Sequence, residues 1–293
     1  LTIVPGTIPT ADFHQFLLGA VAPRPIAFAS TVDTEGVPNL APYSFFNCFS
    51  SNPPILVFSS NRKVANNKTK DTLHNVMDTG EVVINVVTYG IARQAALASI
   101  EYPKEISEFE KAGLTPVPSE VVKPFRVKES PVQMECKVNQ IIPLGEQGGA
   151  GHLIICEVVR MHIDEVVLDE RGRIDPHKID LMGRMGRAFY TRASGEAIYT
   201  IFQPQNLLGI GFDQLPEGIR HSNVLTGNEL AQLAALTKAP VSESVSELKN
   251  DPYVQNLLQS EHPKEALHRY AQKELAKENV ELAAKIAWLG ETL

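Results

Sequence analysis

The chain has 293 residues, of which 43% are hydrophobic and 21% charged, as in an ordinary globular protein with a full core. Its 34 acidic and 27 basic side chains give a net charge of −7, which argues against a nucleic-acid-binding surface over the whole protein but allows a local basic pocket. No apolar run approaches the ~20 residues of a membrane span, and residues 1–10 lack a signal-peptide pattern. The three cysteines lack C-x-x-C spacing. We therefore expect a cytoplasmic protein with reduced thiols.

Short strands separated by turns are predicted first. Residues 26–32 and 37–44 are rich in strand formers and flank a turn, so they predict a hairpin. Residues 55–60 form an apolar run typical of a buried strand. A helix is expected from Asp71 to Gly80, and a further strand at 81–87.

Two longer strands are predicted at 132–142 and 152–163, joined across the glycine-rich segment 145–151. Residues 188–191 and 197–202 are candidates for final short strands. Many short strands with few helices favour a barrel over a doubly wound sheet.

The pattern changes after Pro204. Residues 228–238 and 252–259 predict helices, and a single long helix is expected over 263–288 from apolar residues at helical spacing. The predicted organisation is a mainly β domain over 1–203 and a helical extension over 204–293.

A basic, hydroxyl-rich corner lies at a strand end and a helix start. Such a corner suits a phosphate, because the first N–H groups of a helix are free and cationic side chains add charge-assisted hydrogen bonds. The alternative is a solvated polar loop with an ordinary Asp cap. The candidates are Ser59, Ser60, Arg62, Lys63, Lys70, Asp71 and Thr72, although the carboxylate of Asp71 should point away from a phosphate.

An aromatic corner precedes this basic corner in the sequence. A flat heteroaromatic ring needs an apolar slot with hydrogen-bonding groups at its edge, and an amide and a hydroxyl stand here among aromatic residues. These aromatic residues could equally be core residues at a strand end. The segment contains Ala41, Pro42, Tyr43, Ser44, Phe45, Phe46 and Asn47, and Arg24 lies upstream between two prolines, where it could reach a phosphate or cap a surface.

Other motifs are absent from the sequence. There is no G-x-G-x-x-G after a strand, no P-loop, no G-x-S-x-G and no zinc-ligand spacing, so we expect no metal and no Rossmann unit. His152 should lie at a barrel rim, either in a site or as a hydrogen-bonded rim histidine. Arg184 or Tyr190 could lie near a site, at an interface or on the surface.

Taken together, several motifs in order resemble the flavin reductase-like family, whose fold is the FMN-binding split β-barrel (Greek-key, antiparallel). The resemblance covers roughly the first 200 residues. It rests on Arg24-Pro25-Ile26-Ala27, Asn39 to Asn47, Pro53-Pro54, Lys70-Asp71-Thr72 with Asn75, and Gly80 to Asn85, and more weakly on Gly151-His152 and Gly186 with Tyr190.

The resemblance implies a homodimer with FMN near the subunit interface. It implies a ring along Ala41 to Asn47, a phosphate at Ser59, Lys70 and Thr72, and His152 near the flavin or the nicotinamide. The expected activity is NAD(P)H-dependent flavin reduction, with no nucleic-acid or membrane partner. Three alternatives remain: a flavoredoxin-like electron carrier reduced by a protein, a pyridoxamine-phosphate-oxidase-like enzyme, and a barrel without a ligand. The resemblance does not explain the helical extension.

Overall fold

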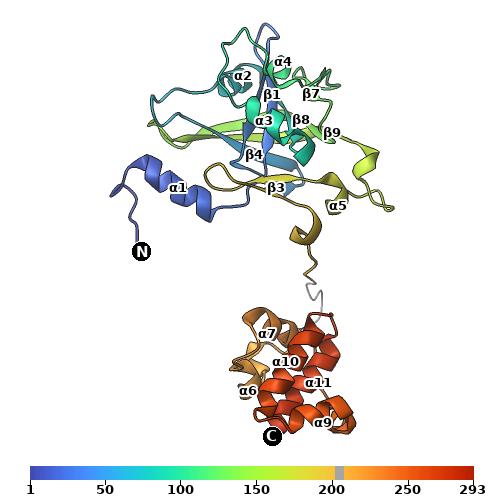
Figure 1. Cartoon of the computed structure of the whole chain (residues 1–293). Coiled ribbons are helices and arrows are strands. Elements are labelled where there is room, and N and C mark those ends of the chain that lie inside the picture. The colour runs from blue at the N-terminus through green and yellow to red at the C-terminus, as the bar shows by residue number, and fades with distance from the viewer. Residues whose placement is uncertain (202–207) are drawn as a thin grey trace. The chain divides into compact units, whose positions relative to one another are not determined.

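The computed structural model of the chain describes residues 1–201 and 208–293. It contains two compact units, Leu1–Tyr199 and Thr200–Leu293 (Figure 1). Among the described residues, no helix is long and apolar enough to cross a membrane.

The first unit is built on one seven-stranded sheet in which every neighbouring pair is antiparallel. Its strand order is β2-β1-β5-β8-β9-β4-β3. The strands are β1 (Ala27–Val32), β2 (Pro38–Tyr43), β3 (Phe46–Ser51), β4 (Pro54–Asn61), β5 (Glu81–Val86), β8 (Val132–Pro143) and β9 (Gly151–Ile163).

Strand β1 separates two hydrophobic clusters. Successive side chains of a strand point to opposite faces, so Ala27 and Ala29 join one cluster while Phe28 joins the other. All six residues of β1 are buried, because β2 and β5 flank it and both faces are covered. The sequence pattern predicted this strand and its hairpin with β2, and the register Ala27↔Tyr43 confirms them.

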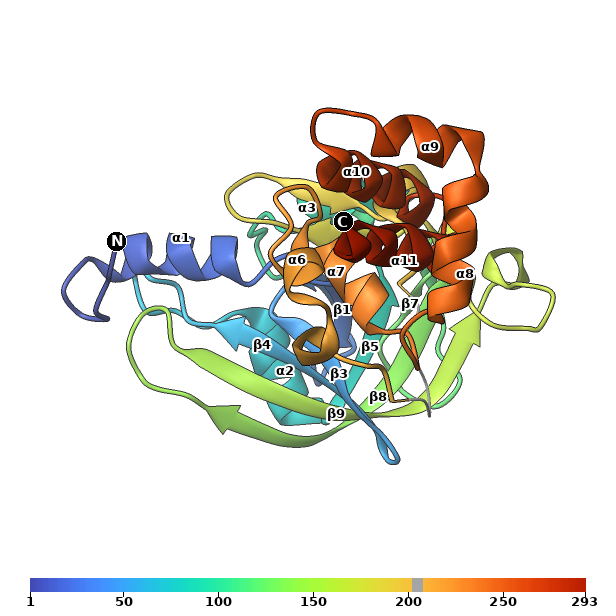
Figure 2. The same ribbon diagram turned by 90° about the horizontal axis from the view of Figure 1, so that it is seen from below.

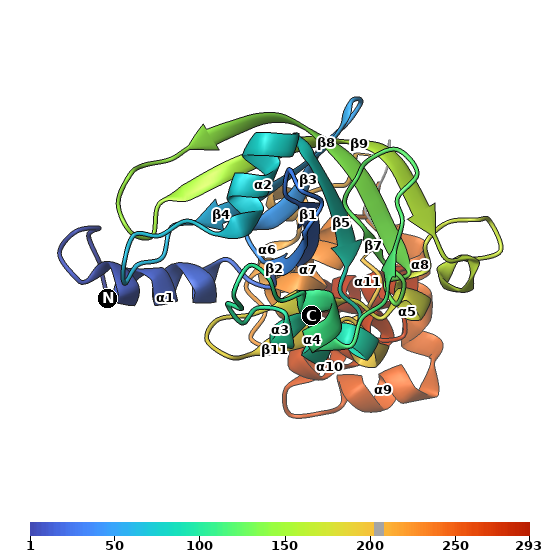
Figure 3. The same ribbon diagram turned by 90° about the horizontal axis from the view of Figure 1, so that it is seen from above.

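The long β8–β9 hairpin curves around helix α2 (Asp71–Thr79), which contacts β1, β2 and β5 (Figure 3). The helix turns Leu73 and Val76 into the core and ends at Gly80, whose φ of 69° is left-handed. A glycine adopts that conformation without the steric cost of a side chain. The helix start at Lys70 and Asp71 is thereby fixed against the sheet.

The remaining elements of this unit are short. Helix α1 (Thr10–Ala20) projects to one side of the sheet, and none of its residues is buried (Figure 2). Other helices are α3 (Ala92–Leu97), α4 (Glu108–Ala112) and α5 (Pro176–Ile179), and the 3-10 turns are Tyr89–Ile91, Glu165–Val167 and Gly195–Ala197. Two small hairpins pair β6 (Pro116–Val117) with β7 (Arg126–Val127), and β10 (Met182–Arg184) with β11 (Tyr190–Arg192).

One predicted strand is wrong. Residues 197–201 form no strand, because Gly195–Ala197 is a 3-10 turn and the following residues have no sheet partner in the described structure. Phe202, the last residue of that prediction, lies outside the described residues.

The second unit is helical and has its own core. Its helices are α6 (Glu217–Arg220), α7 (Gly227–Ala234), α8 (Ser242–Glu247), α9 (Pro252–Leu258), α10 (Pro263–Leu275) and α11 (Val280–Leu289), with 3-10 turns at Phe212–Gln214, Leu248–Asn250 and Gly290–Thr292. The single helix predicted over 263–288 is wrong: it breaks after Leu275. Glu278 has a left-handed φ of 63°, and the Glu274 carboxylate accepts a hydrogen bond from Asn279 at 2.8 Å. The break lets α10 and α11 pack against each other in one core.

Candidate functional site

A cavity of 260 Å³ lies where β2 and β4 end. Segments distant in sequence meet there: the end of α1, the glycine loop before β9, the start of α2, and β10. Its lining residues are His14, Leu18, Arg24, Pro42, Tyr43, Ser44, Phe45, Ser59, Asn61, Arg62, Val64, Lys70, Gly149 and Arg184.

The end of β4 and the glycine loop form the floor. The backbone of Arg62 exchanges hydrogen bonds with this loop, donating to Ala150 O at 2.8 Å and accepting from Gly149 N at 3.0 Å. A Cβ on Gly148 would lie 2.8 Å from Val64 O, so the two loops approach as closely as only glycine allows. The floor is therefore held rigidly by the backbone.

Four cationic side chains line the cavity, and no carboxylate does: they are Arg24, Arg62, Lys70 and Arg184. Among the described residues none of them is within ion-pair distance of a carboxylate, whereas the neighbouring Lys63 is paired with Glu101. Gathering like charges away from water is unfavourable unless an anion compensates them. The donor set is that of an anion-binding cavity.

Arg24 is only 5% exposed and joins three segments. Its guanidinium donates to Leu18 O at 2.7 Å, to Val21 O at 2.5 Å and to Met185 O at 3.0 Å. Burial, together with the charge of Arg184, lowers the pKa of Arg24. Arg24 thus ties the end of α1 to the β10–β11 hairpin and orders one wall of the cavity.

Lys70 stands at the start of α2, with its Nζ 5.3 Å from the centroid of the Tyr43 ring. Burial lowers the pKa of Lys70, although Glu101 acts in the opposite direction. A cation over an aromatic face gains electrostatic attraction. The same end of the cavity carries the positive end of the α2 dipole and the Ser59 hydroxyl.

Buried hydroxyl groups lie behind the wall of the cavity at its Lys70 end. The Tyr43 Oη and the Ser60 Oγ have no hydrogen-bond partner among the described residues, and the Arg62 Nε is also unpartnered. Burial raises the pKa of Tyr43 to about 12, so the phenol stays protonated. Because unpaired buried polar atoms are costly, this wall has spare hydrogen-bonding capacity.

A second cavity of 190 Å³ adjoins the first, sharing Pro42, Ser44 and Arg184 with it. Its other lining residues are mostly small and apolar: Ile26, Val87, Ala92, Ala95, Ala96, Ser99 and Tyr190.

The two cavities bring together most of the predicted cofactor residues. Arg24, Pro42, Tyr43, Ser44, Ser59 and Lys70 line the first, and Tyr190 lines the second together with Pro42 and Ser44. Ala41 on β2 and the buried Ser60 lie next to lining residues without lining a cavity themselves. Asn47 is exposed on β3, where its Oδ1 accepts from the Cys48 N–H at 2.8 Å.

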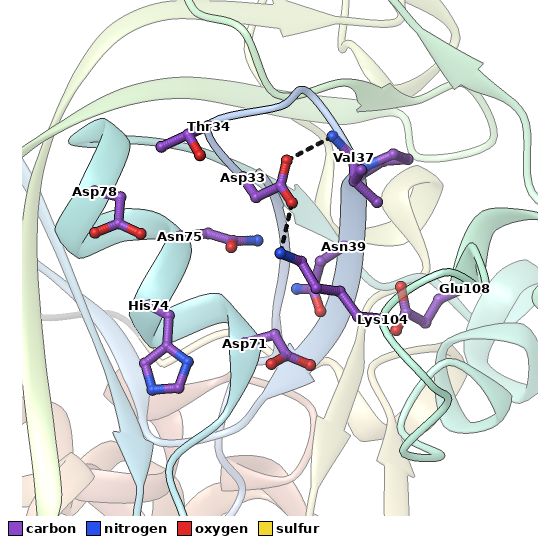
Figure 4. A pocket seen from close by; sticks show the side chains of 11 residues that line it. Asp33, Thr34, Val37, Asn39, Asp71, His74, Asn75, Asp78, Lys104 and Glu108 are labelled. Atoms are coloured by element: carbon purple, nitrogen blue, oxygen red, sulfur yellow. Dashed lines mark hydrogen bonds and ion pairs between the residues drawn. The ribbon is translucent and has the colours of Figure 1, made fainter.

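Thr72 and Asp71 follow Lys70 but turn away from it. Thr72 is buried, and its Oγ1 accepts from Asn39 Nδ2 at 2.8 Å. Asp71 lines a separate pocket, in which Asp33 is bound to Lys104 at 2.9 Å and to the Val37 N–H (Figure 4). The carboxylate of Asp71 thus lies among other acidic side chains, outside the cationic cavity.

His152 also lies outside the cationic cavity. It is 8% exposed at the start of β9, and its Nδ1 is 3.3 Å from Ser60 O. It lines a third cavity of 650 Å³, which shares Arg62 with the first cavity. Among the described residues, no group of three or more side chains is arranged to hold a metal ion.

Several lining residues were not among the predicted ligands. His14 and Leu18 belong to α1, and the His14 ring packs edge-on against Phe45 with centroids 6.0 Å apart. Burial and then the charge of Arg24 lower the pKa of His14. No sequence signal marks α1 as part of a site, whereas Asn61 directly follows the predicted strand and precedes the candidate Arg62.

Comparison with known proteins identifies the family of this chain. The family described as "Flavin reductase like domain" matches residues 19–178, more than half of the chain. An uncharacterised protein of Aquifex aeolicus is 40% identical over 184 residues, covering 62% of this chain and 91% of that protein.

Two solved structures show the same fold. Nitrilotriacetate monooxygenase component B from Bacillus cereus superposes with a TM-score of 0.63 at 35% identity, covering 69% of this chain and 98% of that one. A putative flavin reductase with a split barrel domain from Shewanella frigidimarina gives 0.59 at 25% identity, covering 69% and 99%. The predicted split barrel with a helical C-terminal region is confirmed, and this chain belongs to the flavin reductase-like family.

Proposed function

We propose that this chain is an FMN-binding, NAD(P)H-dependent flavin oxidoreductase and that FMN lies in the 260 Å³ cavity. One observation carries the proposal: in a flavin reductase-like chain, four cations without carboxylate partners line a cavity that also contains an aromatic corner. The cations suit a dianionic phosphate group, and the aromatic corner suits a flat ring. An organic dianion with a flat ring therefore matches both features.

The phosphate end is assigned to Lys70, Ser59 and Arg62. Lys70 supplies a charge beside the start of α2, and the unpartnered Arg62 Nε supplies a buried donor. Because the Thr72 side chain is buried against Asn39 and does not line the cavity, Thr72 would act through its backbone N–H at the helix start. Asp71 is placed outside the phosphate contacts.

The ring end is assigned to the segment Ala41 to Asn47. Pro42, Tyr43 and Phe45 present apolar surface to the cavity, and Ser44 adds a hydroxyl group. Asn47 is assigned a backbone role in this segment, since its side chain is exposed. These residues would hold the ring and exclude water from one face.

When bound, FMN supplies the hydride exchange with a nicotinamide. The chain supplies position and charge: the cations that line the cavity favour the negative charge that reduction adds, and the aromatic wall limits access of water. Burial raises the pKa of the Tyr43 phenol to about 12, so Tyr43 would stay protonated and neutral beside the site in the neutral pH range. No acid–base pair of the protein is required.

A homodimer is also proposed, as in the family resemblance. It is supported by α1, in which Phe16 is 49% exposed and Leu17 is 45% exposed although the helix borders the site. A second copy over this helix would remove that apolar surface from water. Light scattering of the purified chain measures the subunit number directly.

The activity is tested by anaerobic addition of NADH or NADPH to the FMN-loaded protein. The proposal predicts that the flavin absorbance near 450 nm bleaches with at least one nucleotide. A flavin that stays oxidised with both nucleotides, but bleaches with reduced ferredoxin, would indicate an electron carrier instead.

A further inference from the structure

The 190 Å³ cavity beside the proposed flavin site is not needed for the phosphate of FMN. It lies between α3 and the β10–β11 hairpin, and Arg184 is the cation in its lining. We propose that this cavity binds a second substrate, the electron acceptor that meets the flavin after the nicotinamide has reduced it, and that this acceptor is a planar organic anion with a carboxylate group. The inference rests on the proposed function, because it places the ligand next to the flavin ring.

The position of Arg184 is fixed by the backbone. Arg24 N donates to Arg184 O at 2.9 Å, and Arg184 N donates to Arg24 O at 2.8 Å. A Cβ on Gly183 would lie 2.9 Å from a methyl group of Thr191, so the hairpin packs tightly at this point. The fold therefore holds two arginines side by side.

The two arginines have different roles. The guanidinium of Arg24 is used by three carbonyl groups of the protein. The guanidinium of Arg184 makes no hydrogen bond or ion pair with the described residues, and its Cζ lies 4.5 Å from the centroid of the Tyr190 ring. On the same hairpin Arg192 is instead paired with Asp180 at 2.7 Å. Arg184 thus lines both cavities, and its donor fork is not used by the described residues.

The flat floor of this cavity is the reason for proposing a planar ligand. Ala92, Ala95, Ala96 and Ser99 line it from α3 and the residues that follow. Their spacing of three and four residues puts them on one helical face, and small side chains make that face flat. Pro42 and Ile26 contribute further apolar surface.

The volume of the cavity and the charge of its lining narrow the class of ligand. Sites for drug-sized ligands occupy roughly 300–1,000 Å³, so 190 Å³ suits a single ring or a short unsaturated acid. A planar guanidinium binds a carboxylate with two parallel hydrogen bonds. No carboxylate of the protein lines the cavity to compete for them.

The test uses 4-fluorobenzoate and its neutral analogue 4-fluorobenzamide, followed by ¹⁹F NMR with the full-length, FMN-loaded protein. We expect the benzoate to bind roughly ten- to hundredfold more tightly than the benzamide. Arg184→Gln should abolish this preference. Arg187→Gln, which removes an exposed arginine from the same hairpin without altering either cavity, should keep it.

Equal binding of the two ligands to the unchanged protein would overturn the inference, as would no benzoate binding at 10 mM or an equal loss in both variants. Flavin absorbance in each sample shows separately whether FMN is bound. A protein that retains FMN but ignores benzoate contradicts only this inference. Arg184-dependent benzoate binding by a protein that rejects FMN contradicts only the proposed function.

Discussion

A Cβ placed on Gly151 would lie 2.4 Å from the Oγ of Ser59, closer than two such atoms can approach. The two residues stand on the paired strands β9 and β4, where Gly151 opposes Asn61. The Ser59 hydroxyl occupies this space and donates to Asn61 Oδ1 at 2.8 Å. The bare glycine backbone therefore sets the position of a proposed phosphate ligand, whose O–H would turn from Asn61 to the phosphate.

Gly151→Ala is expected to weaken FMN binding at least tenfold, because the new methyl group must displace the Ser59 hydroxyl or separate the strands. Equilibrium titration with FMN measures the effect. Gly90→Ala is the matched control, since a Cβ there meets only Thr88 Oγ1 at 3.6 Å, an ordinary contact. Equal FMN affinities in the two variants would contradict the inference that Gly151 sets the position of the Ser59 hydroxyl.

Glu135 is expected to stabilise the sheet above about pH 4.5. The side chain is fully buried; burial alone would raise its pKa, but hydrogen bonds from the backbone of residues 120–122 and from His162 lower it to about 2. A carboxylate whose pKa is lower in the folded state contributes stability above its unfolded pKa, which is lost as the pH falls through the folded value. The shift corresponds to on the order of 3 kcal/mol.

Glu135→Gln should therefore lower the free energy of unfolding at pH 7 by on the order of 2–3 kcal/mol, with a difference that shrinks as the pH falls from about 4.5 toward 2. Pulsed hydrogen exchange of β8 peptides along a urea series reports on this unit. Glu110→Gln, at an exposed position of α4, is the control. A pH-independent difference would rule out the charged carboxylate as its cause.

His268 is expected to make the helical unit sensitive to acid. It is 2% exposed, with Nδ1 2.8 Å from Ser222 Oγ. Burial and then Lys264 lower the pKa of His268, although Glu291 and Glu265 oppose this. Neutral His268 therefore stabilises the fold above its unfolded pKa of about 6.5, and this contribution is lost as the pH falls.

The single tryptophan, Trp288, packs on the core of the same unit and reports its unfolding. The urea midpoint followed by Trp288 fluorescence should fall between pH 7.5 and 5.5 in the unchanged protein. His268→Gln should flatten that dependence, and exposed His221→Gln should preserve it. The same pH dependence in all three proteins would exclude His268 as the cause of the acid sensitivity.

His152→Gln tests the catalytic role predicted from the sequence. Because His152 lines a different cavity from Lys70, we expect FMN affinity to change less than threefold and the reductase rate less than tenfold. A rate loss of a hundredfold with unchanged FMN affinity would support the catalytic prediction over the structural placement.

Local patterns predicted much of the sheet. Strands β1, β2, β4 and β5 have β-forming residues between turns, and the pairing of β1 with β2 follows from their short connection. Strand β3 was not predicted, because Asn47, Cys48 and Phe49 are exposed and carry no apolar alternation. Its position is decided by pairing with β4 at the sheet edge.

The cavity was predictable where it is local in sequence. Ser59 and Lys70 stand at a strand end and a helix start, which any chain of this pattern would bring to one edge. Arg184 was found only as one of two candidates, since its place depends on a bridge to Arg24 across 160 positions. The break between α10 and α11 was missed because apolar spacing continues through it, and the left-handed Glu278 leaves no composition signal.

The central claim is that the cationic cavity holds FMN with its phosphate at Lys70, and FMN titration followed by flavin fluorescence tests it most directly. We expect one FMN per chain and a dissociation constant raised about ten- to hundredfold by Lys70→Ala, through loss of a charge-assisted hydrogen bond. Lys63→Ala, which removes a nearby lysine paired with Glu101, should change it less than threefold. No saturable FMN binding, or equal effects of the two substitutions, would contradict the account.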